Sequence, residues 1–294
     1  MNLLKYIMLV AFCASLAACG DSGSGNSTPS APTNLSVAPG STSGTAMVSF
    51  AAYSSGGNTI TGFTVTANPG NITASGMSSP ITVTGLTPQT AYTFSVVAKN
   101  NNGNSAQAVT NPLSFYTIVE TFYEPMTQPN NSIFTGTFTY DATSKTVSNL
   151  TGSLTEAMSM SSPMATVSLN NQLSSVSTTL GGVNGLLVTT FDLDTTNTFD
   201  PSGFAPGGTE YYGLSNGATN PSSGGVGNAY AMIFVNTADP TATPVQAQIN
   251  MLAYADCTAG GMMMDTCMTG TTVAGYGRVG TMNGYPQSQV ITLR

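Results

Sequence analysis

The sequence predicts an all-β protein in two units: a sandwich, then a second, larger β-rich unit that is sandwich-like and carries one short helix. Three observations support this prediction. Short stretches alternate apolar and polar residues, as strands with one buried face do. Gly, Pro and Asn turns separate these stretches at intervals of roughly 8 to 12 residues. Every acidic residue except Asp21 follows Ile118, which marks a compositional boundary between the two units.

The composition excludes several classes of function. The chain has 294 residues, of which 40% are hydrophobic and only 6% are charged, so it has enough apolar residues to build cores. Five Lys and Arg stand against 12 Asp and Glu, and the net charge of -7 argues against nucleic-acid binding, which needs a basic patch. There is no histidine, which excludes Ser-His and Cys-His catalysis and imidazole metal sites.

Residues 1–18 have the pattern of an export signal peptide. Lys5 lies near the start, and the apolar run that follows is too short to cross a membrane as a helix. An ordinary cleaved secretory peptide is one interpretation. The four residues that end at Cys19, Leu-Ala-Ala-Cys, resemble the bacterial lipobox. This resemblance implies that Cys19 is diacylated and becomes the first residue of the mature protein, and more than one acyl chain gives stable membrane anchoring.

Residues 19–32 are predicted to be the lipidated cysteine followed by a flexible linker, because Gly and small polar residues dominate them. The lipoprotein resemblance also concerns the final location. In a diderm cell, Gly20 in place of Asp after the cysteine implies onward transport to the outer membrane. We therefore expect an exported protein that a lipid anchor attaches to the cell envelope, at the outer membrane.

Residues 33–118 form the first predicted unit. Period-two alternation is seen in residues 46–50, 63–66 and 92–98. The segment from Leu86 to Tyr92, Leu-Thr-Pro-Gln-Thr-Ala-Tyr, resembles the signature of fibronectin type III domains. The resemblance implies a β-sandwich in which Leu86 and Pro88 are structural. It also implies that the Tyr92 hydroxyl bonds to backbone upstream, as in the tyrosine corner.

The first unit carries little that could perform chemistry. The sequence departs from the family at Phe50, where a Trp is usual, so some aromatic volume is lost from the expected core. Residues 33–118 hold no Asp or Glu and a single lysine, Lys99. Carboxylate proton transfer and carboxylate metal binding are therefore excluded there. A rigid spacer and a binding module both remain open.

Residues 119–294 form the second predicted unit. Its expected strands are residues 134–140, 146–154, 186–193, 230–235 and a last strand that ends at Leu293. One helix is expected to begin with Thr243 as its N-cap and to stop near Cys257. The residues that favour it are Pro244 in the first turn, Gln246 in a capping box, and Val245, Ile249, Leu252 and Ala253 on one face.

Cys257 and Cys267 are the cysteines left after the signal peptide and the lipidated Cys19. In an exported protein an isolated pair predicts a disulfide, here closing a Gly- and Met-rich loop. Cu(I) binding is the alternative, because thioethers and thiolates select that ion. Its ligands would come from Met262, Met263, Met264 and Met268 and from a second cluster of Met158, Met160 and Met164.

A second candidate site is rich in oxygen ligands. Asp192, Asp194, Asn197 and Asp200 crowd the end of an expected strand, and their spacing could supply a structural Ca²⁺ site. The pattern departs from an EF-hand, since Thr196 stands where a ligand belongs. The alternative is that these acids only keep a nearly uncharged surface soluble. No other cofactor is expected.

Enzymatic activity is the less favoured hypothesis. Glu120, Glu124, Glu156 and Glu210 could provide paired carboxylates for glycoside hydrolysis, but nothing in the sequence brings two of them together. Aromatic platforms for sugars could come from Tyr211, Tyr212, Tyr254, Tyr276 and Tyr285. We expect a non-catalytic envelope lipoprotein that binds an extracellular protein or polysaccharide for display, adhesion or scaffolding. A polysaccharide-acting enzyme or accessory domain and a Cu(I)-handling protein are the alternatives.

Overall fold

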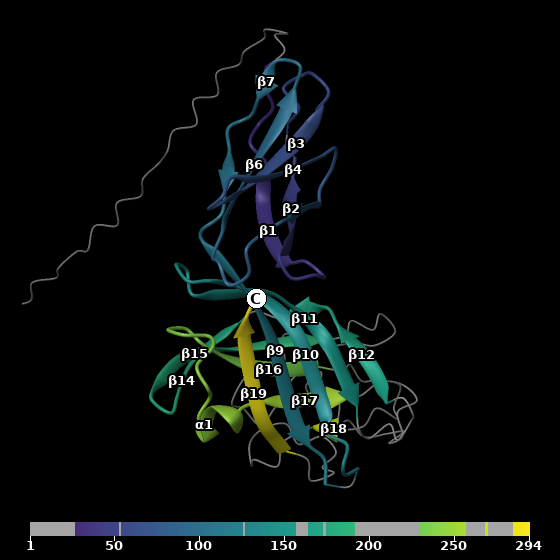
Figure 1. Cartoon of the computed structure of the whole chain (residues 1–294), viewed down its shortest axis with the longest axis vertical. Coiled ribbons are helices and arrows are strands. Elements are labelled where there is room, and N and C mark those ends of the chain that lie inside the picture. The colour runs from purple at the N-terminus through teal and green to yellow at the C-terminus, as the bar shows by residue number, and fades with distance from the viewer. Residues whose placement is uncertain are drawn as a thin grey trace, which may run out of the picture.

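The computed structural model contains two β-sandwich units stacked along the long axis of the molecule (Figure 1). It describes residues 27–52, 54–125, 127–156, 164–172, 175–191, 230–256, 268–269 and 285–294. The predicted all-β class with one short helix is confirmed. In these ranges no helix has the length and apolar character that crossing a membrane requires.

The N-terminal unit packs two sheets face to face. One has the strand order β1-β2-β5, and the other has the order β4-β3-β6-β7 with β8 also paired to β6. Its strands are β1 (Thr33–Pro39), β2 (Thr45–Ala51), β3 (Gly62–Asn68), β4 (Ile72–Gly76), β5 (Ile81–Thr84), β6 (Thr93–Asn100), β7 (Gly103–Asn104) and β8 (Ala108–Val109). The apolar face expected from alternation is the buried one, and Phe50 packs on Phe63 with ring centroids 4.8 Å apart.

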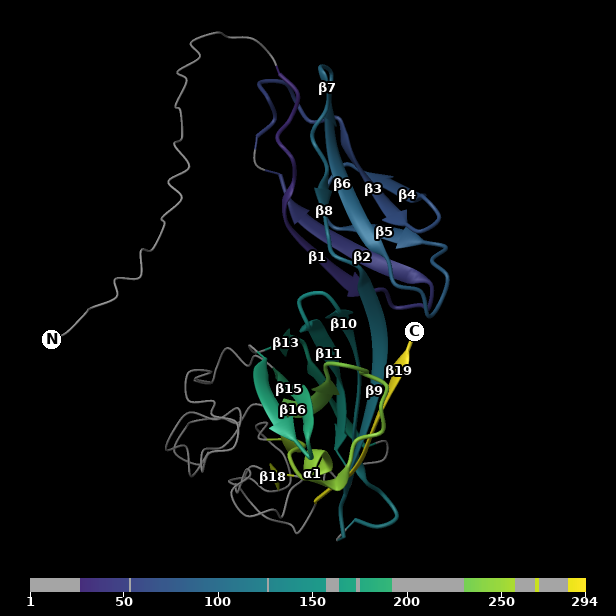
Figure 2. The same cartoon turned by 90° about the vertical axis from the view of Figure 1, so that its left-hand side faces the viewer.

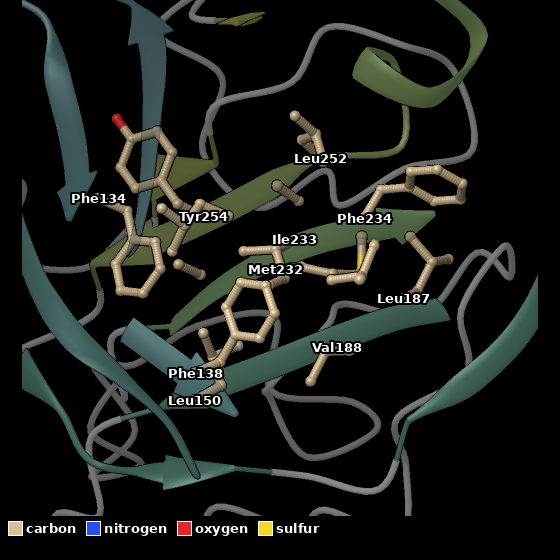
Figure 3. Packing of buried hydrophobic residues seen from close by; sticks show 14 of the residues in the cluster. Phe134, Phe138, Leu150, Leu187, Val188, Met232, Ile233, Phe234, Leu252 and Tyr254 are labelled. Atoms are coloured by element: carbon tan, nitrogen blue, oxygen red, sulfur yellow. The ribbon is translucent and has the colours of Figure 1, made fainter. Parts of the chain in front are cut away.

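The C-terminal unit also has two sheets, of five and six strands. The orders are β12-β11-β10-β9-β19 and β13-β15-β16-β17-β18, with β14 also paired to β15. Its strands are β9 (Leu113–Tyr123), β10 (Ser132–Asp141), β11 (Thr146–Glu156), β12 (Ala165–Leu169), β13 (Asn171–Gln172), β14 (Val176–Leu180), β15 (Val183–Phe191), β16 (Tyr230–Asn236), β17 (Ala253–Asp256), β18 (Met268–Thr269) and β19 (Tyr285–Leu293). Figure 3 shows buried side chains from both sheets gathered in one core.

Two facing glycines make room for a ring in this core. Gly136 on β10 pairs with Gly152 on β11, and the Phe134 ring lies against both. A Cβ atom at Gly152 would come within 2.6 Å of that ring, which is closer than van der Waals contact allows. The fully buried Phe134 therefore depends on the absence of a side chain at both positions.

Glutamine side chains join the two sheets where strand pairing stops. On one side, the Gln289 amide of β19 accepts a hydrogen bond from Phe234 N (2.9 Å) and donates one to Phe234 O (2.7 Å). On the other side, Gln172 of β13 accepts one from Leu150 N (2.7 Å) and donates one to Val147 O (2.9 Å). Each amide supplies one donor and one acceptor, as a neighbouring strand would, so these backbone groups stay satisfied.

The prediction of one helix is confirmed, but its bounds are wrong. Helix α1 spans only Gln246–Ile249 and is capped at Val245, whose N–H donates to the Gln248 side chain (2.9 Å). Ala253, expected on the helix, begins β17, which pairs with β16. Pairing there satisfies the backbone and buries Tyr254 completely, and these gains override the helical periodicity.

Strand β9 belongs to both units. Leu113 and Phe115 lie in the N-terminal core, whereas Tyr116, Ile118 and Phe122 lie in the C-terminal core. Figure 2 shows this strand running unbroken from one unit into the other. The compositional boundary at Ile118 therefore falls within a strand rather than within a linker.

Hydrogen bonds around β9 fix the two units to each other. The Thr139 hydroxyl (2.7 Å) and the Asn149 amide (2.9 Å) both donate to Val37 O of β1. The Arg294 guanidinium donates to Gly40 O (3.0 Å), and its backbone N–H donates to Phe115 O (2.8 Å). Because backbone and side-chain contacts surround the shared strand, the two units form one continuous body.

We expect Gly152→Ala to lower the free energy of unfolding by about 1–3 kcal/mol, because the new methyl group overpacks the Phe134 site. Urea unfolding followed by circular dichroism measures this loss. Ser153→Ala is the matched control. Ser153 is next to Gly152 and its side chain is partly exposed, so this substitution should change the free energy of unfolding by less than about 0.5 kcal/mol. Equal stability of Gly152→Ala and the unmodified protein would show that this packing is not tight.

Candidate functional site

Most residues singled out for chemistry fall outside the described residues. These are Cys19 for lipidation, Cys257 and Cys267 for the disulfide, and Asp192, Asp194, Asn197 and Asp200 for calcium. The same holds for Met158, Met160, Met262, Met263 and Met264 for Cu(I), and for Glu210, Tyr211, Tyr212 and Tyr276 for an enzyme. Their roles stay predictions. Within the ranges that the structure covers, no group of three or more Cys, Asp or Glu side chains is placed to hold a metal ion.

The fibronectin-like segment lies at the junction of the two units. Tyr92 is buried, and its hydroxyl accepts a hydrogen bond from Thr87 N (2.8 Å), five residues upstream. Leu86 is buried in the core, while Pro88 is exposed in the turn between them. The next residue, Gln89, donates its N–H to Arg294 O of the C-terminal unit. This turn therefore forms the hydrogen bond of the tyrosine corner and also contacts the C-terminal unit.

Glu120 is the most unusual residue of the described core. It lies on β9 between Ile118 and Phe122, its side chain is fully buried, and neither carboxylate oxygen has a hydrogen-bond partner. Desolvation raises its pKa well above the usual value, because burial penalises the charged form. Burial therefore favours the neutral form of this carboxyl group.

Glu124 comes directly after the last residue of β9 and is 2% exposed. The Tyr254 hydroxyl, from β17 in the opposite sheet, donates to Glu124 Oε1 and also lies 3.1 Å from the Ser132 hydroxyl. Burial raises the pKa of Glu124 from 4.5 to about 7, although the hydrogen bonds from Tyr254 and Ser132 favour its charged form. The Tyr254 ring packs on Phe122, with centroids 4.5 Å apart.

The two carboxyls contribute to the core rather than to an accessible site. A glycoside hydrolase needs two carboxyls that touch the sugar from opposite sides. Glu120 and Glu124 are both buried, and neither lines the groove between the two units or the groove beside β14 and β15. The sequence did carry a signal for this. Residues 116, 118 and 122 are apolar and share a strand face with 120, so alternation places Glu120 inside.

An open groove of about 590 Å³ lies between the two units. Its lining includes β1 from Thr33 to Val37, residues 108–111, and Asp141. Slight burial opposes the charged form of Asp141, but hydrogen bonds from Asn111, Ser144 and Thr143 outweigh it and lower its pKa. This carboxylate is engaged by its own turn and by Asn111 (2.8 Å), so it helps hold the junction.

The two buried glutamates predict an unfolding free energy that falls as pH rises. The folded-state pKa of each is raised, so each contributes stability that is fully present below pH 4.5 and is lost as pH increases. For Glu124 the loss is complete above pH 7 and is on the order of 3 kcal/mol. Urea unfolding at pH 4.5 and pH 8 measures the difference.

The variants Glu124→Gln and Glu120→Gln should each flatten this pH dependence, because an amide does not titrate. Asp239→Asn is the control: Asp239 is exposed and its pKa is lowered by hydrogen bonds from Thr241, so its loss should not flatten the profile. An unchanged pH profile in both glutamine variants would show that the glutamates are charged in the folded protein.

Comparisons with known proteins address the first unit. The fibronectin type III domain family matches residues 30–116. A crystal structure of chicken CNTN1 FN1-FN3 domains aligns over 90% of this chain and 98% of that chain, at 8% identity and a TM-score of 0.23. A search of the curated proteins gives no match. The N-terminal unit, with its two packed sheets and buried Tyr92, is a fibronectin type III domain, a kind of domain that is generally non-catalytic.

Proposed function

We propose that this protein is a non-catalytic lipoprotein of the cell envelope that holds its C-terminal unit away from the membrane to bind a protein or a polysaccharide. The observation that carries the proposal is the place where the tether joins the folded chain. Ser27, the first described residue, is hydrogen-bonded to Asn100 at the end of β6, and Figure 2 shows β7 at the end of the fibronectin type III domain opposite the C-terminal unit.

Hydrogen bonds hold this attachment point firmly. Ser27 N donates to Gly56 O (2.7 Å), and the Asn100 side-chain amide donates to Ser27 O (2.7 Å) and to Ser55 O (2.8 Å). Asn100 is 1% exposed and is the last residue of β6, where the turn to β7 starts. A membrane anchor at Cys19 would therefore pull on the tip of the first unit and leave the second unit pointing outward.

The shared strand β9 supports the same proposal. A flexible linker would let the C-terminal unit fold back toward the membrane, whereas a continuous strand with hydrogen bonds on both sides keeps it extended. The fibronectin type III domain then serves as a spacer of fixed direction. The C-terminal unit is the part that meets the partner.

The anchor makes a direct prediction. Cys19→Ser removes the acylated sulfur, so the protein should move from the membrane fraction to the soluble fraction. Immunoblotting of separated fractions measures this. Cys257→Ser, which leaves the lipobox intact, should stay with the membrane. Membrane retention of the Cys19→Ser protein would contradict lipid anchoring.

The binding role is tested with the purified full-length protein on arrays of glycans and extracellular proteins. Both units are kept because a cut at residue 119 would divide β9. We expect saturable binding to at least one class of ligand. Binding lost in EDTA would support a calcium site at Asp192, Asp194, Asn197 and Asp200. Turnover of a bound polysaccharide that one carboxylate substitution abolishes would replace the proposal with an enzyme.

A further inference from the structure

The outer face of the five-stranded sheet is a regular array of small hydroxyl side chains. On β9 and β10 the side chains that alternate with the core point outward and are exposed or partly exposed. The register aligns them in three rows across the sheet: Ser168, Ser153, Thr135, Val119 and Val290; Thr166, Thr155, Ile133, Thr121 and Ser288; and Thr151, Thr137, Thr117 and Thr292. We call these rows the hydroxyl face. Figure 1 shows the five strands side by side.

An aromatic pair lies at one end of this face. Tyr123 of β9 is directly opposite Tyr285 of β19, with ring centroids 5.1 Å apart. Tyr285 is 42% exposed. Val119 and Val290 are 40% and 58% exposed and also face each other across the same two strands, with the Thr121–Ser288 pair between them and the tyrosines. The face therefore offers flat apolar surface beside an array of hydroxyls.

None of the residues that form the three rows and the tyrosine pair carries a formal charge. This matters for the choice of partner, because the chain as a whole has a net charge of -7. A nucleic acid or an anionic lipid surface needs Lys or Arg at the contact, which the face lacks. A neutral partner places no unpaired charge against this surface and loses no ion hydration on binding.

We propose that the hydroxyl face binds a chain of a neutral polysaccharide, with one sugar ring on the tyrosine pair. This inference rests on the proposed binding function and names its partner and its surface. Each Thr or Ser hydroxyl both donates and accepts a hydrogen bond, as each sugar hydroxyl does, so the two surfaces match without fixed polarity. Exposed CH faces of the sugar rings cover Val119, Val290 and the tyrosine rings.

A second copy of the chain fits this face less well. The interfaces of homodimers are about 65% apolar, and Ser is depleted from interfaces generally. The hydroxyl face is mostly Thr and Ser, with its apolar side chains confined largely to β9 and β19. Five strands at a spacing of about 4.8 Å make it roughly 20 Å wide, which suits an extended chain of several sugars.

The test is co-sedimentation of the full-length protein with insoluble neutral polysaccharides: cellulose, xylan, chitin and β-1,3-glucan. Calcium polygalacturonate is the anionic comparison. Thr135→Arg and Val290→Arg each place a charge on the row that contains Thr135, Val119 and Val290, which is the middle one of the three. Tyr285→Ala removes half of the aromatic pair. Thr82→Arg is the matched control, since Thr82 is an exposed strand residue of the fibronectin type III domain. Urea unfolding checks that each variant is folded.

We expect binding to at least one neutral polysaccharide, a dissociation constant raised at least roughly tenfold by either arginine variant, and no effect of Thr82→Arg. Tyr285→Ala should also weaken binding about tenfold, because it removes stacking surface. Polysaccharide binding that survives all three substitutions overturns the assignment of the face but leaves the proposed function standing. Binding to a protein on the array, with no binding to any polysaccharide, would also overturn the assignment of the face and leave the proposed function standing. An oligomer that only the arginine variants dissociate would assign the face to a second copy instead.

Discussion

Strand β9 is the constraint on which the rest of the structure depends. Its Leu113 bridges to Tyr92 of the fibronectin type III domain and also pairs with Asp141 of the C-terminal sheet. One residue is thus held by both units, and neither sheet can turn without breaking the other's backbone hydrogen bonds. The direction of the C-terminal unit relative to the fibronectin type III domain and the position of its exposed sheet both follow from this shared strand.

Two carboxyl groups of the C-terminal unit lie on the buried side of the five-stranded sheet. Carboxyl groups are rarely fully buried, yet Glu120 lies inside without a hydrogen-bond partner and Glu124 lies inside against Tyr254, while the hydroxyl face of the same sheet carries no formal charge. Both features come from the same alternation along β9, which sends 118, 120 and 122 inward and 117, 119 and 121 outward.

Side-chain amides of glutamines form hydrogen bonds with backbone groups that have no partner strand. Gln172 and Gln289 satisfy backbone groups at opposite sides of the second sandwich, and Gln248 reaches Leu180 O (3.1 Å) from α1. Amides suit this role because they carry a donor and an acceptor without charge. Sequence patterns indicate nothing of these contacts. Gln289 looks like an ordinary polar residue of a terminal strand until the fold brings Phe234 beside it.

The sequence by itself determined the strand faces, the fibronectin type III domain and the unit that follows it, because alternation and turn residues act over a few neighbours. The exposed Tyr285 could also be named from the sequence, but not its partner Tyr123. Only the tertiary structure decided that β9 crosses between cores, that Ala253 leaves the expected helix for a strand, and that hydroxyls from five strands align. These outcomes depend on pairing between residues far apart in the chain, and a local pattern carries no information about which strand its neighbour will be.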